Sequence, residues 1–139
     1  MNKRRTAASC VIASLVVVSI LATPVIAGFK SGQYVGTTSQ LDQVAQPLNV
    51  GFDVPKNKNK VNIVYFEFLN VDCNKVTQVA GETVKLKKSG KFKLKDADLP
   101  FSSGYIKGKF KGKKASGTAE FPDRCPSAGV IDWEAEKDS

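Results

Sequence analysis

Lysine is the only residue type concentrated enough in this sequence to carry chemistry. Between Lys85 and Lys114 there are eleven lysines and two acids, Asp96 and Asp98, so this segment has a formal charge of +9. An ammonium group on a flexible stem binds phosphate, sulfate or carboxylate groups as a point charge. A row of such lysines on one face would therefore bind an anionic polymer or an anionic surface.

The lysines that alternate with apolar or small residues are the candidates for such a site, because alternation puts every second side chain on the same face of a strand. The candidate polyanion-binding residues are Lys85, Lys87, Lys91, Lys93, Lys107, Lys109 and Lys111. Teichoic or other cell-surface phosphate polymers, anionic lipid head groups and nucleic acid are the ligand classes that suit this charge. The segment has no arginine, and Tyr105 is the only aromatic residue in the same phase. The face therefore offers few side chains on which nucleic-acid bases could stack. For these reasons the favoured interpretation is a solvated face that keeps the protein soluble, partly neutralised by Asp132 and Glu134, and polyanion binding is the functional hypothesis beside it.

The sequence contains no histidine. Ser-His-Asp and Cys-His catalysis, histidine zinc sites and the commonest general base near neutral pH all require one. Asp96 and Asp98 could act as a carboxylate pair on a glycosidic bond. However, short acids next to Pro100 more simply shape a turn, and two carboxylates are too few to hold calcium. We therefore expect a binding or structural module and not an enzyme, with no catalytic residue, metal or small-molecule cofactor.

The N-terminus has the pattern of a secretory signal peptide. Three basic residues at positions 3–5 precede an apolar run over residues 7–22, and small residues up to Ala27 form a cleavage site. A retained membrane anchor is the alternative, although Pro24 interrupts a run that is barely long enough to span a bilayer. We expect cleavage after Ala27 and a secreted, extracellular single domain of residues 28–139 without a transmembrane segment. Its 18 basic and 13 acidic side chains would give a net charge of +5.

Two cysteines remain after the signal segment, Cys73 and Cys125. In an oxidising compartment a disulfide between them is the simplest expectation. It would close a loop of about 50 residues and, in the chain-entropy model, contribute at most about 4 kcal/mol. A redox or metal-binding pair is the alternative, although the sequence offers neither a CxxC spacing nor a histidine.

Period-two alternation of apolar residues predicts an all-β fold. The clearest strand covers residues 47–54, and a first strand is plausible over residues 28–38. The β-rich run over residues 61–73 changes phase, which we attribute to a bulge near residues 64–65. Residues 74–83 are ambiguous between a strand and a loop. Seven or eight short strands, with no helical pattern outside the signal segment, predict an antiparallel β-sandwich or a partly open barrel.

Two hairpins follow in the lysine-rich part of the chain. A two-residue turn at residues 112–113 sets Phe110 opposite Ala115 and Gly108 opposite Gly117. Because this glycine pair leaves a gap on the inner face, we expect the ring of Trp133 to lie over it.

The earlier hairpin turns at Lys88-Ser89-Gly90, with Gly90 in the left-handed conformation, and sets Lys87 against Lys91 and Lys85 against Lys93. The expected core residues are Tyr34, Leu48, Val50, Phe52, Val54, Phe66, Phe68, Leu86, Phe92, Leu94, Ile106, Phe110, Phe121, Ile131 and Trp133.

Several short motifs follow one another in a recognisable order. They are G-x-Y-x-G at 32–36, F-x-V at 52–54, Cys73, G-x-F at 90–92, I-x-G-x-F at 106–110, A-x-G-T at 115–118, Cys125 and W-x-A at 133–135. Together they resemble small secreted bacterial β-domains, common in actinobacteria, whose function is uncharacterised. The resemblance spans residues 32–135 and implies a compact antiparallel β fold with one disulfide. It supplies no active residues to this chain.

The function that we expect is therefore a secreted β-sandwich module with a binding or structural role, and binding of anionic polymers or surfaces through the lysines is the functional hypothesis for it. The alternative is a protein-binding or inhibitor-like module that uses exposed loops such as residues 55–60 or 96–103. Enzymatic activity is the third choice.

Overall fold

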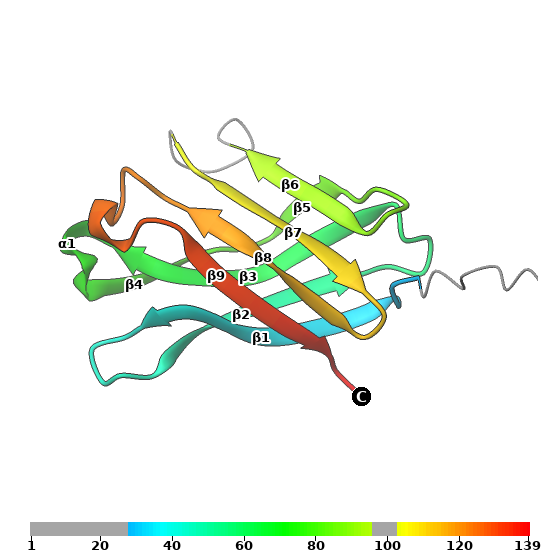
Figure 1. Ribbon diagram of the computed structural model, residues 1–139, viewed down its shortest axis with the longest axis horizontal. Helices are drawn as coiled ribbons and strands as arrows, with labels where there is room; N and C mark the ends of the chain where they lie inside the picture. The colour runs from blue at the N-terminus through cyan, green and yellow to red at the C-terminus, as the bar shows by residue number, and fades with distance from the viewer. Residues whose placement is uncertain (1–27, 96–102) are drawn as a thin grey trace, which may run out of the picture.

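The computed structural model describes residues 28–95 and 103–139 (Figure 1). The predicted signal peptide with its cleavage after Ala27, and the acids Asp96 and Asp98, lie outside the described residues. The strands are β1 (Gly32–Leu41), β2 (Pro47–Val54), β3 (Lys60–Asn70), β4 (Lys75–Val79), β5 (Glu82–Lys85), β6 (Lys91–Lys95), β7 (Tyr105–Lys111), β8 (Lys114–Glu120) and β9 (Ile131–Lys137). Two short helical turns, α1 (Val71–Asn74) and η2 (Pro126–Ala128), complete the described elements.

All nine described strands belong to one antiparallel sheet, in the order β4-β3-β2-β1-β9-β8-β7-β6, with β5 paired to β3. The sheet curls around its own inner face, so that β5 and β6 come side by side although they lie far apart in the strand order (Figure 1). The Lys87 N–H donates to the Lys91 carbonyl at 2.9 Å where they meet. The all-β, antiparallel prediction is confirmed, and one continuous curled sheet corresponds to the barrel alternative and not to two stacked sheets.

The core lies on the inner face of the curl. Every residue expected there is buried, and Phe29, Val61, Ile63 and Val79 join them. Phe52 contacts four other rings, with its centroid 4.7 Å from that of Trp133. The alternation of apolar and polar residues therefore placed the core correctly, because each strand buries one face only.

The hairpin of β7 and β8 has the predicted register. Phe110 pairs with Ala115 and Gly108 with Gly117. A Cβ atom added to Gly108 would lie 2.3 Å from Cζ2 of Trp133, so the indole ring fills the space where the glycine side chains are missing. The Trp133 Nε1–H also donates to the Lys107 carbonyl at 3.2 Å.

The predicted bulge in β3 is confirmed at Val64. Gly51 pairs with Tyr65 and Phe52 with Ile63, so Val64 is the extra residue, and its side chain is exposed. The bulge rephases β3 and lets both halves of the strand bury their apolar residues. The ambiguous segment 74–83 contains β4 and the start of β5.

The predicted turn of the earlier hairpin is confirmed, since the Lys87 N–H donates to the Lys91 carbonyl, but the predicted pairing of Lys85 with Lys93 is wrong. Gly90 has a φ of 83°, as the three-residue loop requires. However, β5 forms its ladder with β3, which places Lys85 opposite Lys60, and β6 pairs with β7, which places Lys93 opposite Lys107. The reason is that β4 covers only the C-terminal half of β3, and β5 satisfies the hydrogen bonds of the other half.

Tyr34 fixes the N-terminal segment to the tip of the β7–β8 hairpin. Its side chain is buried, and its hydroxyl donates to the carbonyl of Lys30 at 2.7 Å and lies 3.1 Å from that of Gly112. Burial raises the pKa of the Tyr34 phenol above its ordinary value of 10.0. The neutral phenol is therefore the form that the fold requires.

We expect Gly117→Ala to destabilise the fold by about 3 kcal/mol, at the upper end for overpacking. Its Cβ atom would meet the Lys107 carbonyl oxygen and the Trp133 ring, and neither has room to move. Urea denaturation followed by Trp133 fluorescence measures the effect. Gly28→Ala is the control, since a Cβ atom there meets nothing within 4 Å. Equal stability of both variants would show that Trp133 does not depend on the glycine pair.

Tyr34→Phe should lower the free energy of unfolding by about 1–2 kcal/mol, because the Lys30 carbonyl loses the hydrogen bond from the buried tyrosine. Since the folded pKa is raised, the contribution of the hydroxyl is fully present below pH 10 and is lost as the pH rises through the folded pKa. The stability difference between wild type and Tyr34→Phe should therefore shrink above pH 10. Denaturation curves at pH 8 and pH 11 measure it, and a constant difference would contradict this account.

Candidate polyanion-binding face

The pairing of β6 with β7 gathers most of the predicted lysines on the outer face of the sheet. Lys91 lies opposite Lys109, and Lys93 lies opposite Lys107. Lys111 continues the β7 row, and all five side chains are exposed. We call these five residues the lysine face. They point outward because their neighbours in sequence, such as Phe92 and Phe110, are held in the core.

The two other predicted lysines have different positions. Lys87 lies in the turn before β6 and lines the same surface hollow as Lys91. Lys85 belongs to β5 and lies opposite Lys60 of β3, so its ladder is not that of the lysine face. Lys95, which sequence reasoning left out, is exposed on β6 in the same phase as Lys93 and lies opposite Tyr105. Extending the alternation by two residues would have found it.

A hollow of about 430 Å³ opens on the lysine face. Its floor is formed by Phe92, Gly108 and Gly117, which lie side by side on β6, β7 and β8. Lysines of β6 and β7, with Ser116 and Thr118 of β8, stand on both sides of this floor. Because the side chains at the three floor positions belong to the inner face, only backbone lies between the lysine side chains on the outer face.

The charges of the lysine face are not neutralised within the described part of the chain. None of its five ammonium groups forms an ion pair with a described acid. Lys93 and Lys107 instead place their Nζ atoms 5.3 and 5.0 Å from the centroid of the Tyr105 ring. Cation–π contacts at exposed sites are worth about 0.5–1 kcal/mol, which leaves the charge available to an anion.

An acidic row lies next to this face. Asp132, Glu134 and Glu136 are exposed on β9, and we call them the acid row. They lie opposite the β8 residues Thr118, Ser116 and Lys114, respectively. Glu136 is paired with Lys114 at 3.4 Å. The uncharged Ser116 and Thr118 therefore separate the lysines of β7 from Asp132 and Glu134, which form no ion pair with any other described residue.

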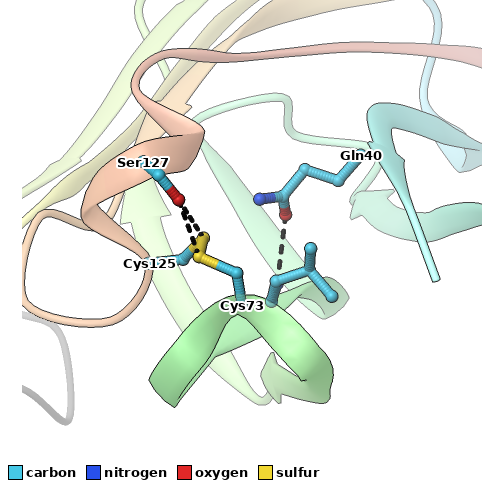
Figure 2. Close-up of a disulfide and its surroundings, with 5 residues drawn as sticks. Gln40, Cys73, Cys125 and Ser127 are labelled. Carbon is cyan, nitrogen blue, oxygen red and sulfur yellow. Dashed lines mark hydrogen bonds between the residues drawn. A yellow bond between two sulfur atoms is a disulfide. The ribbon is translucent and has the colours of Figure 1, made fainter. Parts of the chain in front are cut away.

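The predicted disulfide between Cys73 and Cys125 is confirmed, and the redox or metal-binding alternative gains no support (Figure 2). It joins α1 to the turn before η2, with the Cα atoms 5.0 Å apart. The Ser127 hydroxyl lies 3.0 Å from Sγ of Cys73, and nearby the Gln40 side chain accepts the Leu69 N–H. The described residues contain no group of three or more His, Cys, Asp or Glu side chains arranged to hold a metal.

The other predicted binding surface is less informative. Residues 55–60 form an exposed turn in which Lys58 has a φ of 53°. Most of the loop 96–103 lies outside the described residues. Within the described ranges, no helix has the length and apolar character needed to cross a membrane.

Comparisons with family models, curated proteins and solved structures found no match to this chain. The resemblance to small secreted bacterial β-domains therefore stays a prediction.

Replacing both Cys73 and Cys125 by Ser should lower the free energy of unfolding by about 4 kcal/mol in the chain-entropy model, because the unfolded chain loses a cross-link over 52 residues. Denaturation in urea measures the loss, and reduction of the wild type should reproduce it. Wild type and variant should become equal in reducing buffer. A variant as stable as the oxidised protein would show that the bridge adds nothing to the fold.

Proposed function

We propose that this protein is a secreted binding module that holds anionic polymers on its lysine face. The observation that supports the proposal most is the pairing of β6 with β7, which sets two lysines directly opposite two others. Like charges opposite each other on a sheet destabilise it. A phosphate or sulfate group between the lysines would remove this repulsion. Ligand binding would therefore stabilise an arrangement that is unfavourable in the free protein.

The lysine face also differs from a surface that serves solubility alone. A solubilising surface usually intersperses charges of both signs. Here the lysines of β6 and β7 form a contiguous group, while three neighbouring acids are gathered on β9 and Glu120 lies at the end of β8, opposite Tyr105. The hollow over Gly108 and Gly117 gives an anionic group access to the bases of the lysine side chains. Separation of the charges into two rows and a hollow between the lysines both favour binding.

The test is binding to heparin by the wild type and by the variant in which Lys91, Lys93, Lys107 and Lys109 are all changed to Gln. If these four lysines displace counterions from a single anionic chain, the slope of log affinity against log salt should be about −3, a loss of roughly 50-fold between 50 and 200 mM salt. The quadruple variant should elute near the void volume and lose most of that slope.

A matched control separates local from total charge. Changing Lys56, Lys58, Lys60 and Lys75 to Gln removes the same charge from exposed positions outside the lysine face. This control should keep most of the wild-type slope. Elution of the wild type below physiological salt, or equal losses in the two variants, would exclude the lysine face as the binding site.

A further inference from the structure

The acid row lies two strands away from the lysines of β7 in the same sheet. Resting on the proposed function, we propose that the ligand is a single extended phosphate chain without bases, and that Asp132 and Glu134 exclude double-stranded nucleic acid.

The lysine strip is long and narrow. Along β7, side chains on the same face recur every two residues, or about 7 Å, and the strip from Lys111 to the Lys95–Tyr105 pair is about 20 Å long. Its width is the spacing between β6 and β7, about 5 Å, increased by the reach of the side chains. A single chain that runs along the strands can contact both rows, with the hollow over Gly108 beneath it.

A double helix would extend past the strip onto the acid row. The carboxylates of β9 lie two strand spacings from β7, about 10 Å. The two phosphate backbones of a duplex are about 12 Å apart across the major groove. A duplex with one backbone on the lysines could then place the other over Asp132 and Glu134. Glu136 contributes less, because Lys114 neutralises it.

The position of Tyr105 argues against recognition of bases. A base needs a free aromatic face on which to stack. Tyr105 is the aromatic side chain of the β6–β7 strip, and the ammonium groups of Lys93 and Lys107 both lie within 5.3 Å of its ring centroid. The aromatic ring thus serves to hold two cations in place, and these cations would meet phosphate groups.

The experiment compares inorganic polyphosphate with a 20-base-pair DNA duplex, at equal phosphate concentration and equal salt, using the purified protein. The wild type should bind polyphosphate at least tenfold more tightly. The double variant Asp132→Asn with Glu134→Gln should bind the duplex about five- to tenfold more tightly than the wild type does. Its affinity for polyphosphate should change less than threefold, because a narrow chain does not reach β9.

Glu67→Gln with Glu82→Gln is the charge-matched control, since both acids lie on the β3–β5 side of the sheet. It should leave the preference for polyphosphate unchanged. Equal binding of duplex and polyphosphate by the wild type, tighter binding to vesicles of anionic lipid, or an unchanged preference in the β9 variant would overturn this inference while leaving the proposed function intact. Failure of the wild type to bind polyphosphate, duplex or heparin would refute the proposed function itself.

Discussion

The packing of Trp133 against Gly108 and Gly117 is the contact on which the inner face of the sheet depends. The indole ring fills the space left by the two missing side chains and contacts the rings of Phe52, Phe66 and Phe92. It thereby fixes β9 against β8 and β7 against the core. On the outer face the same two glycines form the floor of the hollow.

The free energy gained by burying the core side chains exceeds the cost of the repulsion between lysines on the outer face. Burying a large aromatic or aliphatic side chain is worth about 1.5–3 kcal/mol. The side chains of Phe92, Leu94, Ile106 and Phe110 are buried on the two strands that carry the lysines. The repulsion between opposed lysines is smaller, because exposed charges are screened and long side chains can separate. The register is therefore set by the inner face, and the charges on the outer face must follow it.

Those parts of the fold that depend on neighbouring residues could be predicted from the sequence. The two-residue turn at Gly112 determines the register of β7 and β8, and alternation determines which side chains are buried. The phase change in β3 revealed the bulge at Val64. The pairing of β5 with β3 could not be predicted in this way, because a three-residue loop suits a hairpin whether or not the two strands form a ladder. Only the short length of β4 leaves the N-terminal half of β3 free for β5.

The residues of the candidate site could be predicted from the sequence, but their positions relative to one another in the sheet could not. Composition identified the lysines, yet their opposition across β6 and β7 depends on a pairing between strands that the segment 96–104 separates. The acid row is still more remote, because β9 reaches β8 only after the turn that contains Cys125. The disulfide ties that turn to α1 at the end of β3, so it restricts the path by which β9 enters between β1 and β8. The constraint that sets acids beside lysines is therefore long-range, and no local pattern in the sequence encodes it.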